Sequence, residues 1–112
     1  MMQQSLPART ALILSALASE HRLRILDLLL EGERCVCEIT PEFELDPSVV
    51  CRHLMLLEQA GVVSSRRDGR RVFYQIADAR VLRLVAVARL MAENPDSARP
   101  VGPRAHAELQ RC

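Results

Sequence analysis

Apolar residues recur three or four positions apart in two segments near the start of the chain, the spacing of one face of an α-helix. This pattern predicts a helix over about Ala8–Leu17 and a second helix that begins after Ser19. Serine at that position can cap the second helix, and Gly32 is expected to end it. After a polar break, Cys35–Phe43 is expected to form a short third helix.

A fourth helix is predicted from Asp46 and Pro47 to about Ala60. Aspartate accepts hydrogen bonds from the free N–H groups of a first turn, and proline has no N–H to leave unpaired there. Gly61 is expected to stop this helix. Its apolar stripe consists of Val50, Leu54 and Leu57.

A β-hairpin is predicted next. Val62–Arg66 and Arg71–Ile76 are short runs that contain valine, phenylalanine and tyrosine, and they flank the dipeptide Asp68-Gly69. Asp-Gly between two such runs is a strong signal for a tight hairpin turn.

A fifth helix is expected to start at Asp78 or Ala79 and to run to about Glu93. It is apolar on nearly every side, which is more apolar surface than the core of one small chain can cover. We therefore expect it to form a subunit interface together with the first helix. The expected interface residues are Leu12, Ile13, Leu17, Val81, Leu84, Val85 and Ala88.

The composition is that of one ordinary globular domain: 112 residues, 49% hydrophobic and 26% charged. We assign residues 1–93 to this domain and residues 94–112, rich in proline and alanine, to a flexible tail. No Gly-rich phosphate loop or Ser/His/Asp arrangement points to an enzyme. No signal peptide or membrane span is expected, so a reducing cytoplasm is the expected location.

Charge is distributed unevenly although the net charge is only +1. Between Ser48 and Ile76 there are five arginines and two acids, whereas between Asp27 and Asp46 there are seven acids and one arginine. A basic segment beside an acidic one favours a protein that meets a polyanion on one face only.

Two short helices followed by a basic hairpin form the pattern of a winged helix-turn-helix, and four segments extend the likeness to a family. The segments are ASEHRLRIL (18–26), CVCEI (35–39), VCRHLMLLEQAGVV (50–63) and RDGRRVFY (67–74). In this order they resemble the ArsR/SmtB metalloregulatory repressors. The resemblance implies a mainly α fold with a β-hairpin wing, a homodimer built on the first and fifth helices, and double-stranded operator DNA with two-fold symmetry as the partner.

The same resemblance implies that the fourth helix reads the major groove. Its N-terminal half is where recognition helices meet base edges, while wing arginines can contact phosphates. The alternative is that these are solvated surface arginines, and His53 can equally have a packing or helix-orienting role. The expected DNA-binding residues are Ser48, Val49, Arg52, His53, Arg66, Arg67, Arg70 and Arg71.

Cys35 and Cys37 match the inducer site of arsenic-responsive members of that family. Thiolates select soft or borderline ions, so the resemblance implies As(III) or Sb(III) as inducer. We expect the two cysteines to be too close for an ordinary structural disulfide. On a helix they would point about 200° apart, so binding one ion would unwind that turn and alter the DNA-reading unit. The alternative is a pair of buried, apolar cysteines.

The third ligand stays open. Thr40 stands where some arsenic-responsive members have a further cysteine. Cys51 and Cys112 are the candidates, and two thiolates can suffice for an organoarsenical.

Other inducers are also open. Cd(II), Pb(II) or Zn(II) are alternatives on the same thiols, although the family's Asp-x-His site for zinc-type ions is expected to be absent because Arg80 follows Asp78 at the histidine position. A redox switch that pairs Cys35 or Cys37 with Cys51 or Cys112 is the alternative of another class.

Overall fold

The computed structural model describes residues 4–102, which divide into two units, one up to Val81 and one from Leu82 onward. We call them the N-terminal and C-terminal units. The N-terminal unit contains α1 (Leu6–Leu17), α2 (Glu20–Leu28), β1 (Arg34–Cys35), α3 (Val36–Ile39), the 3-10 turn η1 (Thr40–Glu42), α4 (Pro47–Gln59), β2 (Val63–Asp68) and β3 (Arg71–Ile76). The helix α5 (Arg80–Glu93) begins in this unit and continues into the C-terminal unit, which also holds the 3-10 turn η2 (Pro95–Ser97).

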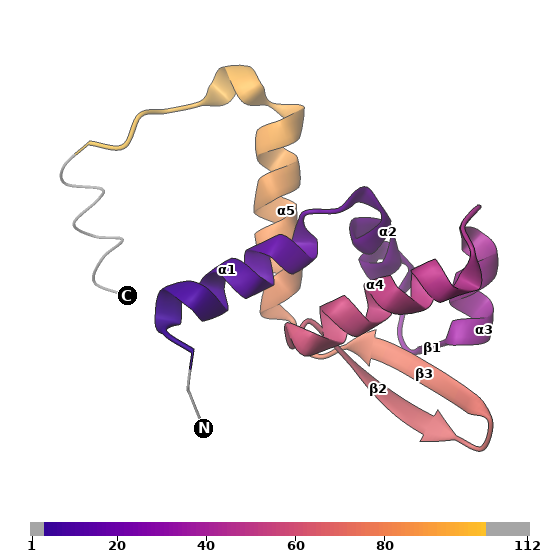
Figure 1. Ribbon diagram of the computed structural model, residues 1–112. Helices are drawn as coiled ribbons and strands as arrows, with labels where there is room; N and C mark the ends of the chain where they lie inside the picture. Colours follow the sequence, from indigo (N-terminus) through magenta and orange to yellow (C-terminus); the bar gives the residue numbers. More distant parts are fainter. Residues whose placement is uncertain (1–3, 103–112) are drawn as a thin grey trace. The chain divides into compact units, whose positions relative to one another are not determined.

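The N-terminal unit is a set of helices with a three-stranded antiparallel sheet on one side (Figure 1). The strand order is β1-β3-β2, so the first short strand pairs with the second strand of the hairpin. In the register Arg34 lies opposite Tyr74 and Cys35 opposite Phe73. This is a winged helix-turn-helix, with α4 as the second helix of the motif and the β2–β3 hairpin as the wing, as the sequence predicts.

The core of this unit is built from the apolar stripes that the sequence shows. Ile25, Ile39, Leu54 and Leu57 have no exposed surface: α2 packs against α4, and α3 packs against β3. The other core residues are Ala16, Leu17, Leu26, Leu29, Cys35, Phe43, Val50, Val62, Val63, Tyr74 and Val81.

Local signals fix the ends of several elements. Ser19 and Asp46 cap α2 and α4 by accepting hydrogen bonds from Arg22 N and Ser48 N. In the wing Asp68 pairs with Arg71, so the turn consists of Gly69 and Arg70. Gly69 has a φ of 63°, which is the left-handed conformation that glycine adopts without a steric penalty.

Two expectations about boundaries are wrong. The second helix ends at Leu28, and a turn then leads to Gly32. The expected helix over Cys35–Phe43 is instead a two-residue strand, one turn of α-helix and a 3-10 turn. Pro41 has no N–H to donate to the carbonyl of Cys37, so regular α-helical bonding cannot continue past this point.

No helix in the part of the chain that the structure describes is long and apolar enough to cross a membrane. Of the expected flexible tail, residues 94–102 are described, and residues 103–112, which include Cys112, lie outside the described residues.

Candidate functional site

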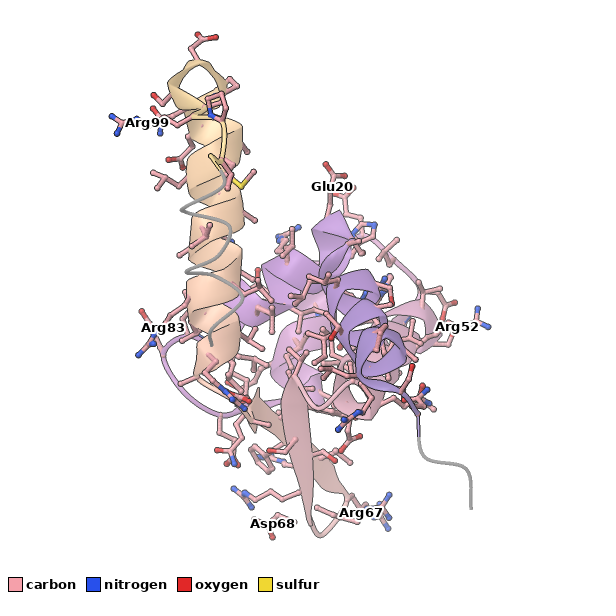
Figure 2. All side chains as sticks on the ribbon, turned by 90° about the vertical axis from the view of Figure 1, so that its left-hand side faces the viewer. Glu20, Arg52, Arg67, Asp68, Arg83 and Arg99 are labelled. Atoms are coloured by element: carbon pink, nitrogen blue, oxygen red, sulfur yellow. A yellow bond between two sulfur atoms is a disulfide. The ribbon has the colours of Figure 1, made fainter. Side chains whose placement is uncertain are left out.

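Helix α4 presents the residues expected to read DNA on its first two turns. Ser48, Val49 and Arg52 are exposed, whereas Val50 and Leu54 point into the core. Figure 2 shows the Arg52 side chain extending away from the ribbon. The helix is therefore held by one side and leaves the other free to enter a groove.

Ser48 is already engaged by the helix cap. Its backbone N–H and its hydroxyl both donate to Asp46 Oδ1, at 2.9 and 2.7 Å, and these bonds lower the pKa of Asp46. The hydroxyl proton of Ser48 is thus used within the protein. Its oxygen can still accept a hydrogen bond, for example from a base amino group.

The wing carries exposed arginines at and beside its tip, and Figure 2 shows Arg67 and Asp68 there. Within residues 4–102 no ion pair involves Arg52, Arg67, Arg70 or Arg71. These guanidinium groups are available for phosphate, and phosphate contacts supply most of the sequence-independent affinity for DNA.

Arg66 differs from the other wing arginines. Its Nε and Nη2 donate to the two carboxylate oxygens of Glu33 at 2.7 and 2.6 Å, and its guanidinium lies 4.5 Å from the centre of the Phe73 ring. The Arg66 hydrogen bonds lower the pKa of Glu33. The expected phosphate contact of Arg66 therefore competes with an ion pair, and the sequence gives no sign of it because the partners are 33 positions apart.

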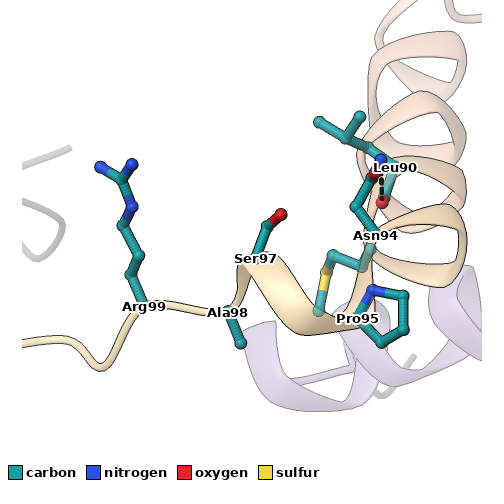
Figure 3. A pocket seen from close by; sticks show the side chains of 7 residues that line it. Leu90, Asn94, Pro95, Ser97, Ala98 and Arg99 are labelled. Carbon is teal, nitrogen blue, oxygen red and sulfur yellow. Dashed lines mark hydrogen bonds between the residues drawn. The ribbon is translucent and has the colours of Figure 1, made fainter.

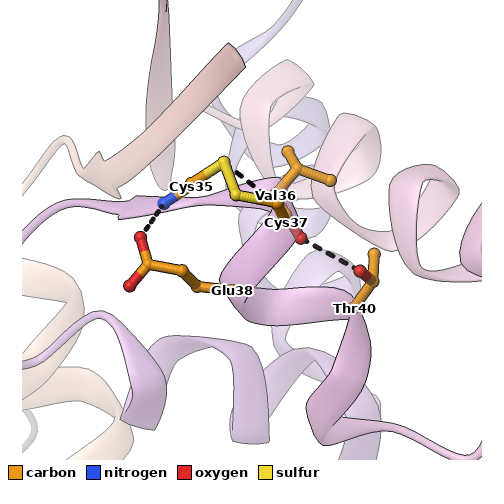
Figure 4. Close-up of a disulfide and its surroundings, with 5 residues drawn as sticks. All are labelled: Cys35, Val36, Cys37, Glu38 and Thr40. Atoms are coloured by element: carbon orange, nitrogen blue, oxygen red, sulfur yellow. Dashed lines mark hydrogen bonds between the residues drawn. A yellow bond between two sulfur atoms is a disulfide. The ribbon is translucent and has the colours of Figure 1, made fainter.

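Cys35 and Cys37 lie together, joined as a disulfide with their Cα atoms 5.1 Å apart (Figure 4). The expectation that they are too close for a bridge is wrong. Cys35 is not inside a helix: it is the N-cap of α3, with extended φ and ψ of −67° and 145°. The expected 200° separation therefore does not apply, and both sulfurs can meet one ion without unwinding a helical turn.

The first turn of α3 depends on Cys35. Its Sγ accepts a hydrogen bond from Cys37 N at 3.1 Å, and its N–H donates to Glu38 Oε1 at 3.1 Å. This reciprocal pair is a capping box, in which two otherwise unsatisfied N–H groups find partners. The cysteine that would bind an inducer is thus also the cap of the helix.

Cys51 does not complete a three-ligand site. It is a partly buried free cysteine on α4. Among the described residues there is no group of three or more His, Cys, Asp or Glu side chains that could hold a metal ion. The pKa of Tyr74, which is near Cys51, is raised mainly by burial and further by the charges of Glu58 and Cys51.

Asp78 matches the aspartate of the family's zinc-type site, which is expected to be absent here, and its carboxylate is already hydrogen-bonded to Arg80. Asp78 accepts hydrogen bonds from the backbone and the guanidinium of Arg80, which lower the pKa of Asp78 to about 2. The carboxylate therefore serves the start of α5.

His53 faces the protein interior more than the other candidate DNA-reading residues do. Arg22 Nη1 lies 3.1 Å from His53 Nδ1, and the His21 and His53 rings are 5.5 Å apart. Burial first, and then the neighbouring cations, lower the pKa of His53. Arg22 was not among the residues that the sequence singled out.

The C-terminal unit exposes apolar side chains along α5, including Leu84, Val87, Leu90 and Met91. Leu90 and Met91 also line a hollow of about 550 Å³ at the end of the helix (Figure 3), where Asn94 Nδ2 donates to the carbonyl of Leu90. The hollow is lined by Leu90, Met91, Asn94, Pro95, Ser97, Ala98 and Arg99. This lining contains one ionisable side chain, so the hollow offers no acid-base pair.

The fold, the exposed first turns of α4 and the basic wing together define a DNA-binding transcriptional regulator of the winged helix-turn-helix class, and not an enzyme. Residues 19–65 match the model of the bacterial regulatory protein arsR family. A probable mercury resistance operon repressor from Streptomyces lividans is 40% identical over 86 residues, 77% of this chain and 69% of the relative. The chain belongs to the ArsR family and is a transcriptional repressor of the ArsR/SmtB type.

Two further comparisons agree. A homolog of the cadmium resistance transcriptional regulatory protein CadC from Staphylococcus aureus is 35% identical over 85 residues, 75% of this chain and 70% of the relative. A homodimeric winged helix-turn-helix DNA-binding domain from Mycobacterium bovis, solved by NMR, superimposes with a TM-score of 0.72 at 34% identity, covering 91% of this chain and 99% of that domain.

Proposed function

We propose that this protein is a cytoplasmic, homodimeric repressor that leaves its operator when Cys35 and Cys37 bind a thiophilic ion, with As(III) or Sb(III) as the inducer. The observation that carries the proposal is the placement of the two sulfurs side by side at the junction of β1 and α3. Thiolates are the ligands that such ions select over oxygen and nitrogen donors.

The position of this pair also supplies a route to the DNA-binding surface. Cys35 pairs with Phe73 in the wing strand β3, and Glu33, two residues earlier, forms the ion pair with Arg66. A change at Cys35 therefore reaches the wing by two routes, the pairing of β1 with β3 and the Glu33–Arg66 ion pair. These routes replace the expected unwinding of a helical turn.

The capping role of Cys35 adds a second effect. An ion that bridges both sulfurs fixes the position of Cys35 Sγ, and where this draws the sulfur away from Cys37 N–H, the first turn of α3 loses part of its cap. Losing an N-cap costs about 0.5–2 kcal/mol in general. Ile39 at the end of α3 is fully buried, and η1, which follows α3 directly, contacts α4, so a shift of this short helix changes the support of α4 through η1.

The number of available ligands limits which ion the site can bind. Two thiolates without a third ligand among the described residues suit an organoarsenical or Hg(II), which the Streptomyces lividans relative's name suggests. Cd(II), suggested by the Staphylococcus aureus relative, and Pb(II) or Zn(II) need further ligands, which Cys51, Cys112 or a second subunit would supply.

The disulfide supports a second candidate, a redox switch in which Cys35 pairs with Cys37 and not with Cys51 or Cys112. In that reaction a peroxide takes two electrons from the two thiols, which lose their protons as the S–S bond forms, and is reduced to water or to an alcohol and water.

A release assay tests both candidates. A labelled duplex that the wild-type protein selects from a random-sequence pool serves as the operator, and fluorescence anisotropy follows its release from reduced protein. Arsenite, antimonite, Cd(II), Pb(II), Zn(II), Hg(II) and peroxide are titrated in turn. We expect arsenite or antimonite to release wild-type protein at a lower concentration than Cd(II), Pb(II) or Zn(II), which need further ligands, while Hg(II), for which two thiolates suffice, serves as the positive control for the thiol pair.

The cysteine variants assign the site. Cys37→Ser keeps a small polar side chain but no soft ligand, so the variant should bind the operator normally and stay bound when arsenite is added. Cys51→Ser is the matched control and should respond as wild type unless Cys51 is the third ligand. Release of Cys37→Ser at the wild-type arsenite concentration would overturn the proposed site, and release by peroxide alone, reversed by dithiothreitol, would favour the redox switch.

A further inference from the structure

The guanidinium group of Arg22 connects three elements of the N-terminal unit. Nε donates to the carbonyl of Ala16 at 2.7 Å, Nη2 donates to the carbonyl of Ser15 at 3.3 Å, and Nη1 lies 3.1 Å from Nδ1 of His53. Arg22 itself is on α2, the carbonyls belong to the last turn of α1, and His53 is on α4. One side chain thus spans the end of α1 and the middle of the DNA-reading helix.

The contact with α1 satisfies a local need. The last carbonyls of an α-helix have no partner within the helix, and a cation near them is favoured by the helix dipole. The last turn of α1 contains no basic residue of its own, so Arg22 supplies the cation from the next helix. This interaction fixes where the guanidinium lies, because two of its nitrogens are bound to backbone atoms.

The contact with α4 is made by the third nitrogen of the guanidinium, Nη1. A guanidinium can only donate, so His53 Nδ1 must be the acceptor, with the proton of the neutral ring on Nε2. Since the backbone carbonyls hold Arg22, this bond restrains His53 and with it the rotation of α4 about its axis. Arg52, the exposed candidate for reading bases, is the adjacent residue.

We propose that Arg22 is a positioning residue for DNA reading: it orients α4 through His53 without touching DNA. The inference rests on the proposed use of α4 and Arg52 for base contacts. It assigns His53 the helix-orienting role and not the direct DNA contact, which the sequence leaves open. Arg22 also connects α4 to α1, which is one of the two helices expected to form the dimer. The distance between the α4 helices of the two subunits therefore depends on the same side chain.

A double-substitution cycle tests the proposal with the selected operator and with random duplex DNA. Arg22→Ala, His53→Leu and the double variant are compared with wild type at a temperature where circular dichroism shows all of them folded. We expect each single variant to weaken operator binding about fivefold to tenfold, the size of one hydrogen bond, with little effect on random DNA. The double variant should lose no more than the larger single loss, because both changes remove the same contact.

Two further readouts separate positioning from other roles. The dependence of operator affinity on salt should keep its wild-type slope in Arg22→Ala, because no phosphate contact is lost. His53→Gln, whose side-chain oxygen can accept the bond from Arg22, should recover most of the affinity that His53→Leu loses. If Arg22→Ala does not fold, Arg22→Lys and the two His53 variants carry the test, since lysine cannot reproduce the fork.

Several results would overturn the proposal. Wild-type operator affinity in folded Arg22→Ala or Arg22→Lys would remove the positioning role, and losses that multiply in the double variant would mean that His53 contacts DNA by itself. A salt slope reduced by about one would make Arg22 a phosphate contact. Arg52→Ala is measured beside them: if it too binds normally, the use of α4 has failed, and if it alone loses affinity, only the positioning role has failed.

Discussion

Single residues in this protein serve local structure and function at once. Cys35 caps α3 and belongs to the proposed inducer site, and Asp46 caps α4 while holding the Ser48 hydroxyl. Glu33 joins the segment before the cysteines to the wing through Arg66. We therefore expect a change of any of these side chains to affect both the element that it stabilises and the surface proposed to meet DNA.

The Glu33–Arg66 pair predicts a pH response with a defined sign. The Arg66 hydrogen bonds lower the pKa of Glu33 from its ordinary value of 4.5, so the contribution of this pair to stability is fully present above that pH. It is lost as the pH falls through the lowered pKa. An NMR titration of the glutamate carboxyl groups should show Glu33 titrating below the ordinary value.

Substitution identifies the cause. Arg66→Ala should return the pKa of Glu33 towards 4.5, whereas Arg67→Ala, which removes the same charge from the next position, should change it little. Identical Glu33 titrations in wild type and Arg66→Ala would contradict the ion pair.

At the scale of elements, we propose that α4 reads base edges and that the wing contacts phosphates. Helix α4 is held by Val50, Leu54 and Leu57 and presents Arg52 outward, while the hairpin carries its arginines beyond the core. Base edges carry sequence information and phosphates do not, so the two elements should differ in how their loss affects specificity.

Arg52→Ala and Arg70→Ala test this division. Arg52→Ala should cost about 1–3 kcal/mol on the operator and relax the preference at one position of each half-site. Arg70→Ala should weaken binding to all sequences alike and reduce the salt slope by about one. Anisotropy titrations on operator and random DNA at several salt concentrations measure both effects, and equal losses on the two DNAs for Arg52→Ala would contradict base reading.

For the whole molecule, the exposed apolar residues of α5 call for a partner surface. Leu84 is 41% exposed and Leu90 59% exposed in the single chain. The homodimeric relative from Mycobacterium bovis supports the proposal that a second copy covers them. Two copies are also what a two-fold operator requires, because each half-site needs one reading helix.

Leu84→Asp tests that interface without disturbing the core of a single chain, since Leu84 is exposed there. Placing an unpaired charge in a buried interface costs about 3–5 kcal/mol, so sedimentation should show monomers and operator affinity should fall. Arg83→Ala, one position earlier on the same helix, is the control and should remain dimeric. A normal dimer of Leu84→Asp with wild-type operator affinity would rule out the interface.

The sequence by itself determined four of the helices, the wing and the class of protein. Helical spacing, Asp46 with Pro47 and the Asp68-Gly69 turn signal act over a few residues, so they can be read without the fold. They placed α1, α2, α4, the hairpin and α5 close to where the structure has them. The resemblance to the ArsR/SmtB repressors, carried by four sequence segments, singled out Cys35 and Cys37 as a pair.

Only the tertiary structure decided how the pair is held and connected. Strand β1 has two residues, too few for a periodic pattern, and it exists because Cys35 pairs with Phe73 far along the chain. That pairing puts Cys35 in an extended conformation, which brings its sulfur to Cys37. Glu33, the ion-pair partner of Arg66, and His53, the side-chain partner of Arg22, lie 33 and 31 positions away, and such contacts follow from packing in three dimensions, which leaves no local pattern in the sequence.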